Sequence, residues 1–217
     1  MTFDDRTDAG SQLADQLSDA GVDADLVCAI PRGGLPVGRV VADRLGLALD
    51  VVVATKLGAP SNPELAIGAV AGDGSVWLND DLVDQLGIDD SYIQRTRETR
   101  AETARNKVAA YRGGDSLPDV ADKRVILVDD GIATGATAIA CLRQLRAGDA
   151  AAVILAVPVA PPTTLGTLSS EADQVIAVTM PGRFRAVGHH YRQFDQVSDE
   201  EAISYLDEPN NGFTETE

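Results

Sequence analysis

The sequence is poor in lysine and cysteine and has no long apolar run. Only three of its 217 residues are lysine, whereas 25 are aspartate, and the formal net charge is −16. A surface this acidic repels phosphate backbones at long range, so general nucleic-acid binding is not expected. Because salt screens the repulsion between acidic side chains, the composition favours a halophilic cytosol; an ordinary acidic protein is the alternative.

The apolar residues are distributed as in a globular protein. Hydrophobic residues make up 44% of the chain, but no unbroken run approaches the roughly 18 residues of a membrane-spanning helix. The first residues are acidic and lack the hydrophobic stretch of a signal peptide. We therefore expect a cytoplasmic protein with no membrane partner, and a length of 217 residues suits a single α/β domain.

The two cysteines, Cys28 and Cys141, lie in apolar segments and form neither a CxxC motif nor a Cys/His cluster. A disulfide or a zinc site is therefore disfavoured, and both thiols are expected to be buried as small hydrophobic groups. The sequence likewise indicates no Cys–His or Ser–His–Asp arrangement, so none of its motifs requires a covalent nucleophile.

Five apolar segments are continuous rather than alternating, which is typical of strands in a parallel sheet covered on both faces. These segments are 24–30, 49–57, 124–130, 151–160 and 174–181. Apolar residues at helical spacing predict helices between them, at 6–20, 36–45, 136–147 and 161–168. The alternation predicts an α/β fold with a doubly wound, mainly parallel sheet, which binds ligands beyond the carboxyl ends of its strands.

Two segments between the second and third of these strands follow other patterns. Residues 66–78 predict a hairpin that turns at 72–74. Residues 80–112 are polar, rich in arginine and glutamate, and helix-prone. A helix of this kind forms either a solvated face or a subunit contact, so a homodimer is one candidate assembly; a phosphate-facing stripe of arginines is the less favoured alternative.

Three unusual loops, at 31–36, 58–66 and 129–137, each follow a predicted strand and should lie along one edge of the sheet. The third begins with two acids and continues as small residues into a helix, so its backbone N–H groups suit a phosphate. Its residues are Asp129, Asp130, Gly131, Ile132, Ala133, Thr134, Gly135, Ala136 and Thr137. Because the loop lacks the lysine of a Walker motif, nucleoside triphosphate hydrolysis is not favoured.

Asp129 and Asp130 would repel a phosphate if they pointed at it. They are better explained as acceptors for sugar hydroxyls, or as Mg²⁺ ligands acting through water. A phosphate flanked by a diol is a feature of ribose 5-phosphate. The alternative is that the acids cap the helix that follows.

Residues 125–138, "VILVDDGIATGATA", also resemble the signature of the type I phosphoribosyltransferases, which use 5-phosphoribosyl-1-pyrophosphate (PRPP). The order of predicted elements over roughly 24–181 agrees with the core of that family. The resemblance implies that Asp129 and Asp130 hold the ribose hydroxyls and that 131–137 holds the 5-phosphate. Mg²⁺ is the expected cofactor, because it can neutralise a leaving pyrophosphate.

The loop "IPRGGLP" offers a second set of phosphate-binding groups. The guanidinium of Arg32 can fork to phosphate oxygens, and Gly33 and Gly34 allow backbone amides to approach closely. The resemblance implies that this is the pyrophosphate loop, with a cis peptide bond between Pro31 and Arg32. An ordinary glycine-rich turn is the alternative.

Lys56 is the third candidate, because it is one of so few lysines and stands just before the turn-rich loop 58–66. The resemblance implies that Lys56 contacts pyrophosphate and that 58–66 is a flexible loop that closes over the reacting centre. A lysine that reaches into solvent is the alternative.

The resemblance further implies a C-terminal hood, at about 181–206, that packs over the base. Its candidates for stacking on a planar ring or bonding to it are Phe184, His190, Tyr191 and Phe194. The alternative is that these rings pack against the sheet. The chain 1–217 is then one phosphoribosyltransferase-like domain, with a tail at 207–217 that is predicted to be disordered.

These features predict Mg²⁺-dependent transfer of ribose 5-phosphate from PRPP to a nitrogenous base, with release of pyrophosphate. Lys56, Asp129 and Asp130 are the expected catalytic residues, because a cation neutralises the leaving group and positioned carboxylates support the ribosyl centre. A PRPP- or nucleotide-sensing regulator of the same fold is the alternative, although a sensor needs neither Lys56 nor its loop. Hydrolysis, with water as the acceptor, is a third possibility.

Overall fold

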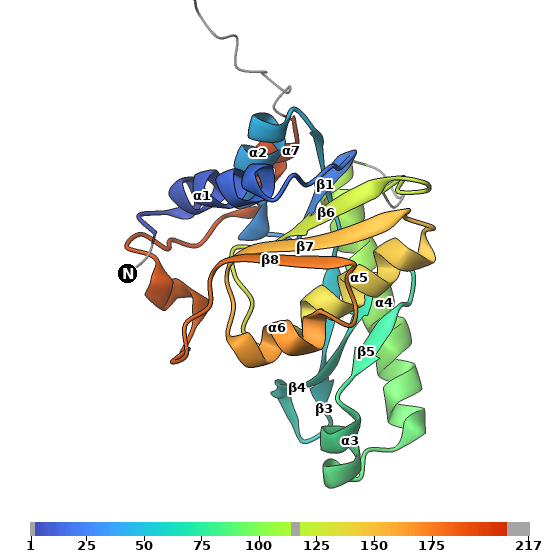
Figure 1. The fold of residues 1–217 in the computed structure, drawn as a ribbon. Coiled ribbons are helices and arrows are strands. Elements are labelled where there is room, and N and C mark those ends of the chain that lie inside the picture. The colour runs from blue at the N-terminus through green and yellow to red at the C-terminus, as the bar shows by residue number, and fades with distance from the viewer. Residues whose placement is uncertain (1–2, 114–117, 208–217) are drawn as a thin grey trace, which may run out of the picture.

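The computed structural model describes residues 3–113 and 118–207. Its main sheet has five parallel strands in the order β2-β1-β6-β7-β8 (Figure 1). The strands are β1 (Leu26–Ala29), β2 (Ala48–Val51), β6 (Arg124–Val128), β7 (Ala152–Val159) and β8 (Gln174–Thr179). The predicted doubly wound parallel sheet is therefore confirmed. Most of the predicted tail, 208–217, lies outside the described residues.

Helices cover both faces of this sheet. On one face lie α1 (Arg6–Asp19) and α2 (Gly34–Leu45), and on the other lie α5 (Ala136–Ala147) and α6 (Pro162–Leu168) (Figure 1). Local signals mark the ends of these helices. The Asp5 side chain accepts the Asp8 N–H at the start of α1, and Gly46 ends α2 in the left-handed conformation with φ 68°.

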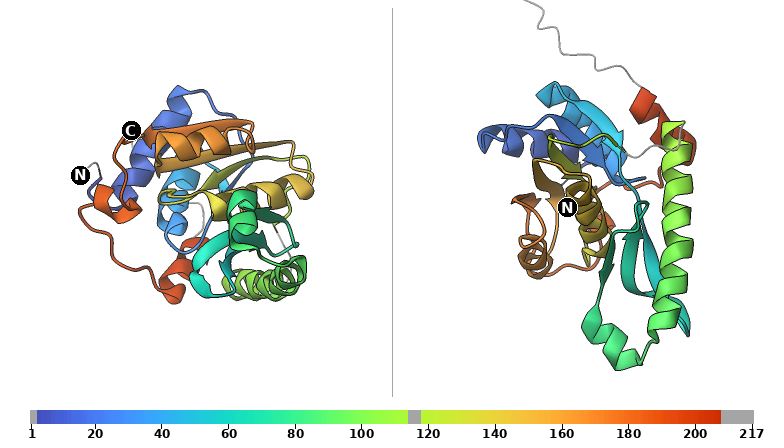
Figure 2. Two further views of the ribbon diagram at one scale, coloured as in Figure 1. Left: turned by 90° about the horizontal axis from the view of Figure 1, so that it is seen from below. Right: turned by 90° about the vertical axis from the view of Figure 1, so that its right-hand side faces the viewer.

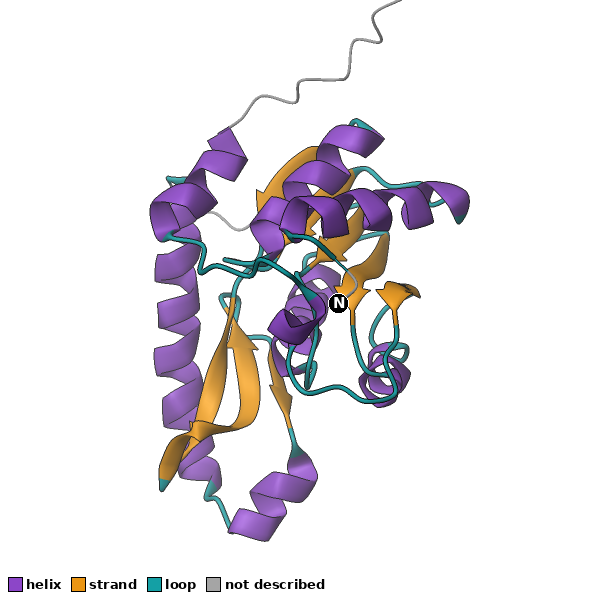
Figure 3. Cartoon of the chain, turned by 90° about the vertical axis from the view of Figure 1, so that its left-hand side faces the viewer, coloured by secondary structure: helices purple, strands orange, loops and turns teal. Residues whose placement is uncertain are grey.

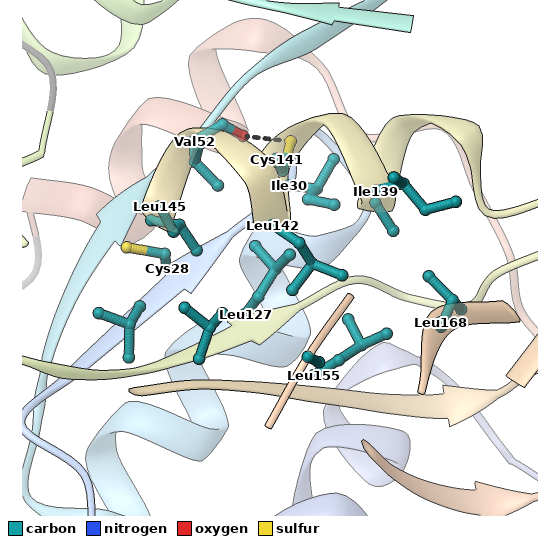
Figure 4. Close-up of a cluster of buried hydrophobic side chains, with 14 of the residues drawn as sticks. Cys28, Ile30, Val52, Leu127, Ile139, Cys141, Leu142, Leu145, Leu155 and Leu168 are labelled. Atoms are coloured by element: carbon teal, nitrogen blue, oxygen red, sulfur yellow. Dashed lines mark hydrogen bonds between the residues drawn. The ribbon is translucent and has the colours of Figure 1, made fainter. Parts of the chain in front are cut away.

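The strand residues alternate between two apolar cores. Val27 and Ile126 face α1 and α2, whereas Cys28, Leu127 and Leu155 pack against Leu142 and other residues of α5 (Figure 4). Both cysteines are fully buried free thiols, as predicted. Continuous burial on both faces explains why the central strands are apolar throughout.

A second, antiparallel sheet extends away from the main sheet (Figure 2). It contains β3 (Ala54–Ala59), β4 (Asn62–Ala71) and β5 (Val76–Leu78). The long helix α4 (Asp90–Arg112) runs alongside it, and the short helix α3 (Asp80–Leu86) lies at its outer end (Figures 1 and 2). The hairpin predicted at 66–78 is confirmed as β4 and β5.

The single strand predicted at 49–57 is wrong, because the chain leaves the main sheet after Val51 and begins β3 at Ala54. Residues 58–66, predicted to form a flexible loop, instead form the two arms of the β3–β4 hairpin around a turn at 60–61. The reason is burial: Leu57 and Ile67 are fully buried in an apolar cluster that also contains Ala101 of α4.

The C-terminal segment returns across the molecule to the N-terminus (Figure 3). It contains the 3₁₀ helix η1 (Val187–His190) and α7 (Asp199–Asp207). Backbone bonds join the two segments: the Phe3 N–H donates to the His190 carbonyl at 3.0 Å, and the Arg192 N–H donates to the Phe3 carbonyl at 3.0 Å. Within the described residues, no helix combines the length and apolarity that crossing a membrane requires.

Candidate functional site

The central strands β1 and β6 bring two of the predicted loops together. They are parallel neighbours, with Ala29 opposite Val128, so the loop at 31–34 and the acids at 129–130 leave the sheet side by side. From β1 the chain crosses to β2 on one side, and from β6 it crosses to β7 on the other. Such a switch point is where doubly wound sheets form ligand clefts.

The two loops are in very close contact. A Cβ atom added at Gly33 would lie only 1.9 Å from Oδ2 of Asp130, and one at Gly34 would lie 2.9 Å from the Val128 carbonyl. These glycines therefore permit the approach. The peptide bond between Pro31 and Arg32 is cis, as predicted.

The loop 131–137 is anchored near its start. Ile132 is buried, and its N–H donates to the Val159 carbonyl at 2.9 Å. The Thr164 hydroxyl donates to the Ala133 carbonyl at 2.7 Å. Gly135, with φ 85°, then turns the chain into the first residue of α5. The loop thus presents its backbone at a helix N-terminus, the arrangement that binds anions.

Lys56 faces this same loop, although it comes from the second sheet. A cavity of about 180 Å³ is lined by Lys56, Asp129, the segment 131–138 and Val187. Small residues hold the second sheet against α5, because Ala69 of β4 packs in a buried cluster with Ala136 and Ala140. The structure therefore brings together three of the predicted elements: the lysine, one of the two acids and the phosphate loop.

Arg32 lines a different cavity, of about 390 Å³, between α4 and α7. There its Nη1 lies 3.7 Å from Oδ1 of Asp199, which also accepts the Tyr111 hydroxyl at 2.7 Å. Lys107 of α4 lines this cavity as well. Sequence reasoning missed Lys107, although its rarity as a lysine is the same signal that marked Lys56.

The two acids are partly buried and are joined by a hydrogen bond. Asp129 Oδ1 accepts the Asp130 N–H at 2.8 Å. Burial, together with the neighbouring charge of Asp130, raises the pKa of Asp129 well above its usual range. Burial also raises the pKa of Asp130, against the opposing effect of the Arg6 guanidinium. Oδ2 of Asp130 accepts from Nε of Arg6 at 2.9 Å, a contact that no sequence motif indicated.

The four ring-bearing hood residues differ in their placement. Tyr191 is buried beside Phe3, and its hydroxyl donates to the Asp130 carbonyl at 2.5 Å, which favours a packing role. Phe184 stacks on His190 with ring centroids 5.4 Å apart. Phe194 is partly exposed, and the Arg6 guanidinium lies over its ring in a cation–π contact. The lining of the Lys56 cavity includes Val187 from the hood but none of these rings.

Asp129 and Asp130 have the chemistry that a Mg²⁺ site needs. In the described part of the chain, His, Cys, Asp and Glu form no cluster of three or more that could hold a metal. Mg²⁺ often binds through one or two carboxylates, several waters and substrate phosphates. The two carboxylates beside the phosphate loop fit that mode.

A family model and two curated relatives match most of the chain. Residues 4–192 match the model of the family described as the phosphoribosyl transferase domain. Two Mycobacterium tuberculosis proteins, from strains CDC 1551 / Oshkosh and H37Rv, are each named "Putative phosphoribosyl transferase"; both are 42% identical over 98% of the chain. The chain spans about half of their length, 48% in each case.

A solved structure shows the same fold. It is the crystal structure of the protein TT1426 from Thermus thermophilus, which is 39% identical in sequence. The match covers 95% of this chain and 98% of that one, with a TM-score of 0.80.

Proposed function

The chain belongs to the type I phosphoribosyltransferase family, and on that premise we propose that it transfers ribose 5-phosphate from PRPP to a nitrogenous base and releases pyrophosphate. The observation that carries the proposal is the single cavity lined by Asp129, the loop 131–137 and Lys56. The proposal is supported because a hydroxyl acceptor, an anion site and a cation around one cavity would suit the ribose, the 5-phosphate and the pyrophosphate of PRPP.

The ground state is held by the phosphate loop and the two acids. Backbone N–H groups of 131–137 other than that of Ile132, which donates to the Val159 carbonyl, bind the 5-phosphate together with the hydroxyls of Thr134 and Thr137. Asp129 and Asp130 accept hydrogen bonds from the ribose hydroxyls. This binding fixes C1 of the ribose relative to the incoming base, so that reaction occurs between positioned partners.

The reaction breaks the bond between C1 and the pyrophosphate oxygen and forms a bond from a base nitrogen to C1, and that nitrogen gives up its proton to solvent. The electron pair of the broken bond leaves with pyrophosphate. We expect Lys56 and Arg32, which line different cavities of the protein, to stabilise together the charge that develops on the pyrophosphate. Mg²⁺, held by Asp129 and Asp130 through water, would supply further neutralisation of the leaving group.

The base is proposed to bind under the hood. Phe184, His190 and Phe194 have ring surface that is not fully buried, so they are the candidates for stacking. Tyr191 supports them through its contact with Phe194, at 4.9 Å between ring centroids. The acidic surface further supports activity in a salty cytoplasm, and α4 is the candidate surface for a homodimer.

The test is pyrophosphate release from PRPP with Mg²⁺ in concentrated potassium chloride, with a panel of purine and pyrimidine bases. We expect release that depends on one base and falls about 100-fold in Lys56→Ala. The matched control is Lys123→Ala, because Lys123 pairs with Asp119 at the opposite end of the sheet and should not affect turnover.

Each other outcome leads to a different conclusion. Release without any base indicates hydrolysis. Tight PRPP binding without release under any condition indicates a sensor and contradicts the transferase. Equal loss in both lysine variants would show that Lys56 has no special role.

A further inference from the structure

Arg6 joins the ribose-binding acids to the hood. Its Nε donates to Oδ2 of Asp130 at 2.9 Å, and its Nη1 donates to the Asp195 carbonyl at 2.8 Å. The guanidinium carbon lies 4.0 Å from the ring centroid of Phe194. One side chain therefore contacts a carboxylate of the proposed PRPP site, the hood backbone and a hood ring.

The position of Arg6 is fixed by its surroundings. Its side chain is only 12% exposed, and that of Asp130 is 13% exposed. Arg6 is the first residue of α1 and follows the segment at 3–5, which is bonded to the hood through Phe3 and through the bond from the Gln193 N–H to the Asp4 carbonyl at 2.9 Å. The guanidinium is thus held from its backbone side as well as by its partners.

We propose that Arg6 is a positioning residue for ribose binding, an inference that rests on the proposed function. By holding Oδ2 of Asp130, it fixes the rotation of the carboxylate and leaves Oδ1 outside that hydrogen bond to accept a ribose hydroxyl. The same guanidinium lies over the Phe194 ring and donates to the Asp195 carbonyl, so it also links the ribose site to the hood.

An arginine is well suited to this task. Its planar fork can donate to a carboxylate through one nitrogen and to a carbonyl through another while its face lies on an aromatic ring. A lysine supplies the charge but is a point donor without a flat face. The proposal therefore predicts that Arg6→Lys rescues only part of the function lost in Arg6→Gln.

The experiment is isothermal titration calorimetry with three probes in the presence of Mg²⁺: PRPP, ribose 5-phosphate and pyrophosphate alone. In Arg6→Gln we expect PRPP and ribose 5-phosphate to bind about tenfold more weakly, as for the loss of one charged hydrogen bond. Pyrophosphate makes no direct contact with Asp130 in the proposed complex, so its affinity should change much less than that of ribose 5-phosphate. A residue that only stabilises the fold would not separate these ligands.

Two further variants complete the set. Phe194→Leu removes the ring under the guanidinium without touching Asp130, and we expect it to weaken ribose 5-phosphate about threefold. This variant also keeps the test decisive if Arg6→Gln fails to fold. The matched control is Arg192→Gln, because Arg192 makes an exposed ion pair with Asp4 between the same two segments.

The inference is overturned if Arg6→Gln binds ribose 5-phosphate as well as the unaltered protein does, or better. It is also overturned if pyrophosphate affinity falls equally, or if Arg192→Gln has the same effect. Ribose 5-phosphate binding that depends on Arg6, without transfer to any base, would refute the proposed function and leave the inference standing. Failure of the unaltered protein to bind PRPP would overturn both.

Discussion

Replacing Gly33 by alanine tests the contact between the two central loops most sharply. The added Cβ would lie 1.9 Å from Oδ2 of Asp130 and 2.5 Å from its Cγ, whereas ordinary contacts begin at 3.4 Å. Asp130 cannot yield easily, because Arg6 holds the same oxygen and the Tyr191 hydroxyl holds its carbonyl. The carboxylate must therefore move by more than about 1 Å, away from the ribose hydroxyl that it is proposed to bind.

A displacement of about 1 Å at a reacting centre lowers the rate about 100-fold, which corresponds to about 2.7 kcal/mol. We expect kcat/KM for PRPP to fall by that factor in Gly33→Ala, and overpacking to reduce the free energy of unfolding by about 1–3 kcal/mol. The assays are steady-state kinetics and urea denaturation.

The control is Gly166→Ala, because a Cβ at that position of α6 meets nothing within 4 Å. Activity should be unchanged there, and alanine should raise stability by about 0.5–1 kcal/mol. Normal PRPP kinetics in Gly33→Ala would refute the view that this glycine makes room for Asp130.

Three further predictions concern burial. Cys28 and Cys141 are fully buried with a raised pKa, so Ellman's reagent should label neither thiol until the protein is unfolded; rapid labelling of the folded protein would contradict their placement. Ala140→Leu should overpack the contact between α5 and the second sheet and so displace Lys56. We expect lower turnover and a loss of about 1–3 kcal/mol in the free energy of unfolding. Normal turnover would show that the alanine contact does not position the lysine. Asp129→Asn should raise the melting temperature at neutral pH while abolishing PRPP binding. Because burial raises the pKa of Asp129 in the folded state, its charge costs stability as pH rises through that pKa, so the gain should vanish in acid, and a gain independent of pH would contradict this cause.

The main sheet was predictable from the sequence, because its central strands are buried on both faces and are bounded by clear turn residues. The prediction of a single strand failed at 49–57, because this one apolar segment contributes a strand end to the main sheet and a strand start to the second sheet. Val51 ends a parallel strand, and Leu57 is buried in the separate cluster against α4. Both environments select apolar residues, so hydrophobicity alone could not locate the change of sheet.

The site was predictable only where its residues form local motifs. The acids and the phosphate loop are contiguous in sequence, and the cis bond falls in a glycine-rich loop. The role of Arg6 was not predicted, because its partner Asp130 lies 124 residues away and no local motif connects the two positions. The only local signal is a single arginine among the acidic residues at the N-terminus, which has no specific interpretation without the fold.

The most direct test of the account is a crystal structure of the protein with PRPP and Mg²⁺. We expect the 5-phosphate within hydrogen-bonding distance of the 131–137 amides, the ribose hydroxyls at Asp129 and Asp130, and the pyrophosphate between Lys56 and the loop of Arg32. PRPP bound elsewhere, for example with its phosphates in the cavity beside Lys107 and the 131–137 loop empty, would contradict it.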